Sequence, residues 1–157
     1  MPPAFETRFQ GPEHSPGFLL WQVTNLWQRK QRAALKALGL THVQFVLLAS
    51  LAWLEHDGAA VSQVQLAQQA QTDLMMTSQV VRTLQVKGLI ERNRQPHDSR
   101  ANALTLTATG STLIRRALPV VETVDEEFFS ALKEGRSELV DLLRALLPEQ
   151  EKEGRRT

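Results

Sequence analysis

The most constraining feature of this sequence is the order of patterns between positions 62 and 110: two short helical patterns, a strand, a charged loop and a second strand. The first helix is expected to bury a face formed by Leu66, Ala67 and Ala70. A polar break follows, in which Thr72 or Asp73 can cap the next helix, because a short side-chain oxygen accepts from unpaired backbone N–H groups. The order predicts a helix pair followed by a β-hairpin.

The second helix of the pair has two chemically different sides. On a helical wheel, the side expected to pack inward carries Thr77, Val80, Val81 and Leu84. The opposite side carries Met75, Ser78, Gln79, Arg82 and Val86. Gly88 is expected to end the helix as a C′ glycine. A buried face opposite a face of donors, acceptors and one guanidinium is what a helix needs to read bases in a DNA major groove.

The hairpin is predicted as a strand over Leu89–Arg94, a loop over Gln95–Arg100 and a strand over Ala103–Leu106, with Pro96 excluding a helix from the loop. Arg100 at the hairpin tip can insert into a minor groove, and Asp98 is expected to orient Arg100 or to bond the turn backbone. Taken alone, the charged residues of this loop favour an ordinary solvated hairpin. Joined to the preceding helix pair, they favour the wing of a mainly α winged helix-turn-helix.

Several short motifs carry a resemblance to a known family. Residues 40–45 read LTHVQF, residues 87–90 read KGLI, and DSR at 98–100 is followed by LT at 106–107 and by Gly110. With these spacings the sequence resembles the MarR-type (multiple antibiotic resistance regulator) transcription factors, over about residues 17 to 147. Thr41 and Gln44 also predict a capping box at the start of a helix. The pair Met75-Met76 departs from the small polar residues of many members, which concerns the bases that are read.

The resemblance implies one MarR-like domain over 1–157, with a DNA-binding lobe at 41–107 and dimerisation helices at 17–39 and 108–147. It implies a homodimer whose two recognition helices meet a pseudo-palindromic operator, acting as a repressor or less often as an activator. The DNA-binding residues expected are Thr72, Met75, Ser78, Gln79, Arg82, Arg94, His97 and Arg100. Family members often bind small aromatic or phenolic effectors, so Trp21, Trp27 and Trp53 are pocket candidates, although most tryptophans in small domains are core residues.

Composition excludes several other classes of protein. The 157 residues contain no cysteine, so a disulfide framework, a thiolate zinc site and a thiol redox switch are excluded. The four histidines are scattered, and we expect no metal, no cofactor and no enzymatic activity. No apolar run approaches the ~20 residues of a membrane span. The N-terminus lacks the pattern of a signal peptide, which favours a cytoplasmic protein.

Charge is divided along the chain although the net value is only +1. Residues 61–116 contain seven basic and three acidic residues, and residues 119–157 contain six basic and ten acidic ones. A basic middle and an acidic end fit a DNA face and a separate assembly face. The end is expected to hold a helix kinked at Pro119 and a last helix with a leucine stripe, Leu139, Leu142, Leu143 and Leu146, closed by Pro148. The rival hypotheses are a ligand-insensitive DNA-binding protein and a winged helix used for protein contact.

Overall fold

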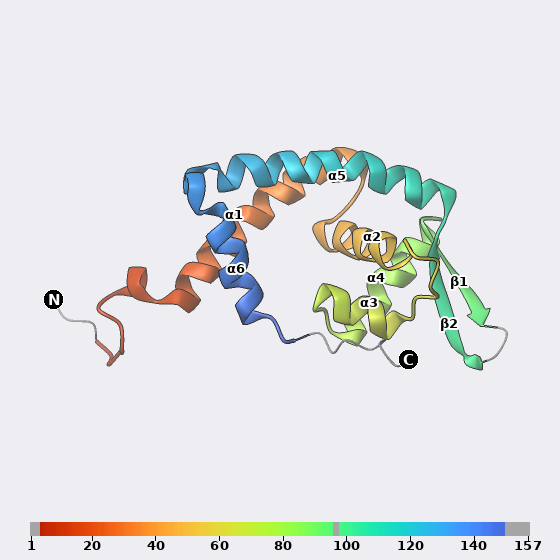
Figure 1. Ribbon diagram of the computed structural model, residues 1–157, viewed down its shortest axis with the longest axis horizontal. Helices are drawn as coiled ribbons and strands as arrows, with labels where there is room; N and C mark the ends of the chain where they lie inside the picture. Colours follow the sequence, from red (N-terminus) through yellow and green to blue (C-terminus); the bar gives the residue numbers. More distant parts are fainter. Residues whose placement is uncertain (1–3, 96–97, 150–157) are drawn as a thin grey trace. The chain divides into compact units, whose positions relative to one another are not determined.

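The computed structural model of the protein describes residues 4–95 and 98–149. It divides into two compact units, Met1–Val124 and Asp125–Thr157. In chain order the elements are η1 (Pro12–His14), α1 (Pro16–Leu35), η2 (Lys36–Leu38), α2 (His42–Leu54), α3 (Gln63–Ala70), α4 (Leu74–Val86), β1 (Ile90–Gln95), β2 (Asp98–Leu106), α5 (Ala108–Phe129), η3 (Ser130–Gly135) and α6 (Arg136–Leu146) (Figure 1). The run from α3 to β2 confirms the predicted winged helix-turn-helix.

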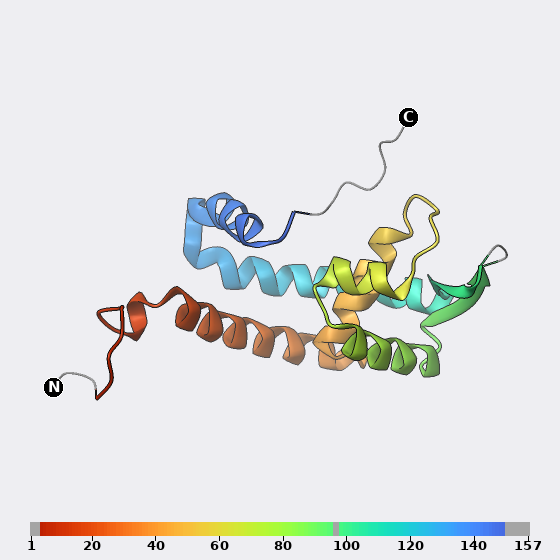
Figure 2. The ribbon, with the colours of Figure 1, turned by 90° about the horizontal axis from the view of Figure 1, so that it is seen from below.

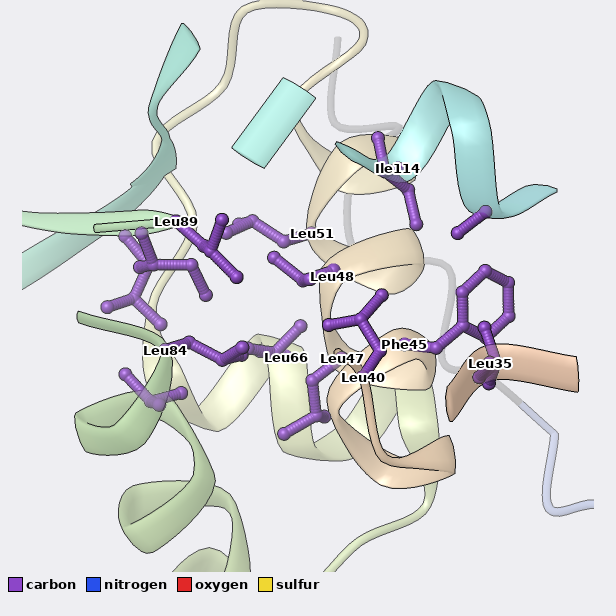
Figure 3. Packing of buried hydrophobic residues seen from close by; sticks show 14 of the residues in the cluster. Leu35, Leu40, Phe45, Leu47, Leu48, Leu51, Leu66, Leu84, Leu89 and Ile114 are labelled. Carbon is purple, nitrogen blue, oxygen red and sulfur yellow. The ribbon is translucent and has the colours of Figure 1, made fainter. Parts of the chain in front are cut away.

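The core of the first unit surrounds α2. Leu48 and Leu51 of α2 are fully buried, as are Leu66 of α3 and Leu84 of α4. Figure 3 shows these side chains gathered together with Leu89, which precedes β1. Each fully buried leucine contributes about 1.5–3 kcal/mol relative to exposure, so this cluster is the main force that joins the helices of the lobe. A helix in the middle of a core must be apolar on most sides, as HVQFVLLASLAWL is.

Side chains next to the helix starts determine where α2 and α3 begin. Thr41 Oγ1 accepts from the Gln44 backbone N–H at 3.2 Å, and Gln44 Oε1 accepts from the Thr41 N–H at 3.2 Å. This confirms the predicted capping box. A second box joins Ser62 and Gln65 at the start of α3, with N–O distances of 3.1 and 2.8 Å. Each box satisfies two donors that the first turn of a helix would leave unpaired.

The wing is a two-stranded antiparallel sheet in which Ile90 pairs with Leu106 and Arg94 with Asn102. The predicted loop over Gln95–Arg100 is wrong in its extent, because β2 already begins at Asp98. Asp98 pairs with Gln95, and a register irregularity separates this pair from the next pair, Arg94 with Asn102. Arg100 therefore belongs to a strand and not to the connecting loop. Pro96 and His97 lie outside the described residues.

The junction of α4, β1 and α5 depends on a close backbone approach at Gly110. The Thr107 hydroxyl donates to the Gly88 carbonyl at 2.7 Å and accepts from the Gly110 N–H at 2.9 Å. A Cβ at Gly110 would lie 2.1 Å from the Leu89 carbonyl oxygen, so only glycine fits there. Gly88 has φ of +72°, which confirms the predicted C′ glycine after α4. The Thr107 and Gly110 pair thus fastens the start of α5 to the end of the recognition helix.

Helix α5 continues through Pro119 without a break, and the kink expected there stays a prediction (Figure 1). Pro119 is exposed, and water can therefore bond the carbonyl that lacks a helical donor. The Thr123 hydroxyl donates to the Pro119 carbonyl at 2.8 Å. The helix keeps a buried face formed by Gly110, Ile114, Ala117 and Val121.

The second unit holds the end of α5, η3 and α6. The predicted last helix is confirmed as α6, which ends at Leu146 before an extended Leu147 and then Pro148. Its leucine stripe is present, and none of the α6 residues is buried in its own unit.

No single helix in the described ranges is long and apolar enough to cross a membrane. The segments Pro16–Leu38 and His42–Leu54 meet the length and composition criteria only as a pair bent by 78°. Half of that pair is α2, whose leucines form the core described above.

Candidate DNA-binding surface

The recognition helix α4 starts at a cap that fixes its first turn. Asp73 Oδ1 accepts from the Met76 backbone N–H at 2.7 Å, so Asp73 and not Thr72 is the N-cap. The Thr77 hydroxyl donates to the Asp73 carbonyl at 2.7 Å, and it lies 2.7 Å from the Thr72 hydroxyl. Since the Thr77 proton is already used, Thr72 donates to Thr77. The structure thus gives Thr72 a bond within the turn, and its contact with DNA stays a prediction.

The two sides of α4 are separated as the sequence predicts. Thr77, Val81 and Leu84 are fully buried, and Val80 is half-buried. The predicted reading side is solvent-facing, with Met75, Gln79 and Arg82 exposed and Ser78 half-buried. Figure 2 shows α3 and α4 next to each other, with the wing projecting beyond them. The core thereby orients an amide and a guanidinium away from the protein.

The wing is attached to the helix pair by contacts that the sequence analysis missed. The Arg92 guanidinium donates to Gln63 Oε1 at 3.1 Å, joining β1 to the first residue of α3. Val61 forms an isolated bridge with Leu104, whose N–H donates to the Val61 carbonyl at 2.7 Å. The wing therefore keeps its position relative to α3. The side chains of Arg94, His97, Asp98 and Arg100 lie outside the described part of the structure.

Lys87 is a second residue whose position only the structure reveals. Its ammonium donates to the Gly39 carbonyl at 2.8 Å and to Gln44 Oε1 at 3.0 Å. In the sequence it is one of seven basic residues of the middle segment. In the structure it ties the end of α4 to the start of α2, so we assign it to positioning the recognition helix. The capping box predicts from the sequence where Gln44 lies, but it does not predict that Lys87 binds there.

A carboxylate ties α2 to the end of the wing. Glu55 Oε1 accepts from the Leu106 backbone N–H at 2.8 Å. Burial raises the pKa of Glu55 above its ordinary value of 4.5, and the hydrogen bond from Leu106 acts in the opposite direction. No sequence pattern predicts this pair.

The three tryptophans do not gather at one place. Trp21 and Trp27 lie on α1, where Trp27 makes an edge contact with His42 at 4.9 Å between ring centroids. Trp53 lies near the other end of α2, ~16 Å further along its axis, and stacks on His56 at 5.1 Å. Trp27 is half-buried, whereas Trp21 and Trp53 are exposed. A ligand pocket that includes these rings stays a prediction.

No group of three or more histidine or acidic residues in the described segments is arranged to hold a metal ion. The predicted turn after α2 is confirmed by the Asp57 carboxylate, which accepts from the Ala59 N–H at 3.2 Å beside Gly58. His56 and Asp57 therefore serve this turn.

A capped helix with a polar outer side, fastened to a two-stranded wing, defines a winged helix-turn-helix protein of the DNA-binding type. The model of the MarR family matches residues 40–101. The chain is 50% identical over 127 residues to the HTH-type transcriptional regulator YdcH of Bacillus subtilis, covering 81% of this chain and 86% of that protein. The chain belongs to the MarR family of transcriptional regulators and is not an enzyme.

Solved structures of this family are similar to the chain. A mutant of Escherichia coli MarR in complex with operator DNA aligns with a TM-score of 0.75 and 26% identity, over 84% of this chain and 93% of that one. A MarR family protein of Mycobacterium tuberculosis in complex with salicylic acid aligns with a TM-score of 0.66 and 30% identity, over 85% and 96%.

Proposed function

We propose that the protein is a homodimeric repressor that binds a pseudo-palindromic operator and is released by a small aromatic ligand. The observation that carries the DNA-binding part is the outward side of α4, where Gln79 and Arg82 are exposed above a fully buried inner side. Among the described residues Arg82 has no ion-pair partner, so its guanidinium is available to a base or phosphate.

In this proposal α4 enters the major groove and the wing follows the neighbouring minor groove. Gln79 and Arg82 can make bidentate contacts with adenine and guanine, each worth ~1 to 3 kcal/mol of discrimination. Thr72 and Ser78 would contact the backbone beside them. The basic residues of the wing, Arg94, His97 and Arg100, would follow the minor groove and its phosphates, with Asp98 orienting Arg100.

The homodimer is supported by apolar side chains that one chain leaves exposed. On α1 these are Phe18, Leu19, Leu20, Trp21, Val23 and Leu26. A second set lies on α6. Exposed apolar side chains concentrated on one helix in this way are typical of an interface. We propose that residues 17–39 and 108–147 dimerise, so that the lobes over 41–107 present two copies of α4 to the DNA.

The ligand part of the proposal rests on the salicylic acid complex of the related protein and on the aromatic side chains of α1 and α2. A phenol or aromatic acid would have to bind the DNA-free state more tightly than the DNA-bound state, because a ligand shifts an equilibrium only through such a difference. A compound of this class should quench the fluorescence of Trp21, Trp27 or Trp53 and weaken operator binding together. If a broad panel changes neither, the ligand-insensitive alternative is the better description.

The test of DNA binding is enrichment of random duplexes by the purified protein, followed by binding of variants to operator mutants at two salt concentrations. We expect two half-sites about one helical turn apart. Gln79→Ala and Arg82→Ala should relax preference at particular positions, whereas Arg100→Ala should weaken binding to all sequences and lower the salt slope by about one. Arg116→Ala, on α5, is the matched control and should keep wild-type preference. Failure to enrich any duplex would favour the protein-contact alternative.

A further inference from the structure

The outward side of α4 carries an apolar residue, Met75, in its first turn, which is the part of a recognition helix that contacts bases. Met75, Gln79, Arg82 and Val86 follow one another at helical spacings of four, three and four along the side opposite the core. The side chain of Met75 is 75% exposed and lies in the first turn. In helix-turn-helix proteins the N-terminal residues of the recognition helix contact the base edges.

The cap of α4 decides what kind of group can approach this first turn. The Asp73 carboxylate occupies the Met76 backbone N–H and places a negative charge at the helix start. A helix N-terminus attracts phosphate through its unpaired N–H groups, but here the Asp73 carboxylate already accepts from one of them and its charge repels a phosphate. The cap therefore favours an uncharged base edge over a phosphate beside Met75.

Only one base edge in the major groove offers an apolar group. Thymine carries a 5-methyl group there, and apolar side chains recognise it by contact. Methionine suits this contact, since its unbranched thioether adapts to the shape of its partner. We infer that Met75 reads a thymine 5-methyl group in each half-site of the operator. This inference rests on the proposed function, because it presupposes that α4 enters the major groove.

The geometry of α4 also places this thymine. Met75 precedes Gln79 by ~6 Å along the helix axis. Base pairs are spaced ~3.4 Å apart, so the thymine should lie one or two base pairs from the base that Gln79 contacts. Leu74 and Met76 are exposed to either side of the stripe and not along it. Val86 lies on the stripe but ~16 Å from Met75, at the opposite end of α4.

The experiment replaces thymine by deoxyuridine, which removes the methyl group and leaves every hydrogen-bonding atom of the base. Affinities are measured for the enriched operator and for duplexes with one substitution at each thymine. The proteins are the wild type, Met75→Ala, Met75→Leu and Val86→Ala. Met75 and Val86 are both exposed, so these variants should fold normally, which thermal unfolding checks. Val86→Ala is the matched control, being an apolar truncation on the same side of α4.

The wild type should lose roughly four-fold in affinity at one thymine of each half-site, the effect of one methyl-sized group. Met75→Ala should bind the thymine and uracil duplexes equally at that position, whereas Met75→Leu and Val86→Ala should keep the difference. If the wild type binds the operator but ignores every methyl group, or if Met75→Ala keeps the full difference, the inference is wrong and the proposed function stands. If no duplex is bound by any protein, the proposed function fails and the inference fails with it.

Discussion

Helices α2 and α6 are both rich in leucine, but they place these side chains in opposite surroundings. In α2, Leu47, Leu48 and Leu51 are fully buried. In α6, Leu142 is 60% exposed and Leu146 is 76% exposed. α2 packs against α3, α4 and β2 inside its own unit, whereas α6 is in contact with η3 of the small second unit.

The difference shows that an apolar stripe in a sequence does not identify its partner. A stripe can be satisfied by the same chain or by another one, and the cost of leaving it in water is similar in either case. The leucines of α2 pack against other helices of the same chain, so internal contacts should be enough to keep the lobe folded. For α6 we propose a second copy of the chain. Substitutions inside the lobe and substitutions on α6 should therefore affect different quantities, the first the free energy of unfolding and the second the association of two chains.

The largest effect is expected where the lobe depends on its closest backbone approach. Gly110→Ala would place a methyl group 2.1 Å from the Leu89 carbonyl oxygen, a distance that only a backbone shift can relieve. The shift would separate α5 from the end of α4 and break the Thr107 bonds. We expect a loss of more than about 3 kcal/mol in the free energy of unfolding, measured by urea denaturation.

Gly17→Ala is the control for this change. Gly17 lies in α1, and a Cβ there would meet no atom within 4 Å. Because alanine is the better helix former, this substitution should be neutral or slightly stabilising. Equal stability of the two alanine variants would contradict the role given to Gly110.

The second effect should appear in assembly and not in the lobe. Replacing Leu142 and Leu146 by Ala removes two exposed side chains of α6, so the lobe should lose little stability. If Leu142 and Leu146 are buried against a second copy, each substitution should weaken dimerisation by about 1.5–3 kcal/mol per protomer. Sedimentation at several concentrations measures this, and deletion of residues 138–157 should yield a monomer or an aggregate.

The control for assembly is Arg144→Ala on the same helix. Arg144 and Asp141 lie 3.7 Å apart and are both largely exposed. Such a pair contributes at most ~1 kcal/mol, so its loss should leave the dimer intact. A protein lacking residues 138–157 that stays a soluble dimer would rule out α6 as the interface.

Local chemistry explains why the sequence could predict much of the lobe. The buried side of α4 follows from helical periodicity, with Thr77, Val81 and Leu84 one or two turns apart. The start of α2 follows from the capping box of Thr41 and Gln44, and the end of α4 from Gly88. Each of these signals involves residues at most a few positions apart.

The rest could not be predicted because it depends on residues that only the fold brings together. Lys87 meets Gly39, and Glu55 meets Leu106, across 48 and 51 positions of the chain. The second strand of the wing was predicted too short, since its extension to Asp98 depends on a backbone irregularity near the turn and not on side-chain type. The proposed partner of α6 is a second copy of the chain, and one sequence does not specify such an assembly.

A smaller effect tests how firmly the recognition helix is held to the lobe. Lys87→Met keeps the aliphatic stem and removes the bonds to Gly39 and Gln44. We expect a loss of about 1 kcal/mol in the free energy of unfolding, because the side chain is partly solvated. Hydrogen exchange should also quicken at the end of α4. Lys30→Met removes one positive charge from α1 and should change neither the free energy of unfolding nor the exchange rate at the end of α4. If it changes them as much as Lys87→Met does, the loss of charge is responsible and not the loss of the Lys87 hydrogen bonds.

The smallest effect should be a pH dependence at the joint between α2 and the wing. Burial raises the pKa of Glu55 above 4.5, so the folded protein holds this proton more tightly than the unfolded chain. The stability that this gives is fully present below about pH 4.5 and is lost as the pH rises through the folded-state pKa. Glu55→Gln keeps an acceptor for the Leu106 N–H and does not titrate. Wild type should therefore lose stability relative to Glu55→Gln as urea denaturation is repeated from pH 4 to 7. Glu55→Ala removes the acceptor and should be less stable than Glu55→Gln at every pH. A constant difference between wild type and Glu55→Gln over this range would show that the carboxylate ionises without cost in the folded lobe.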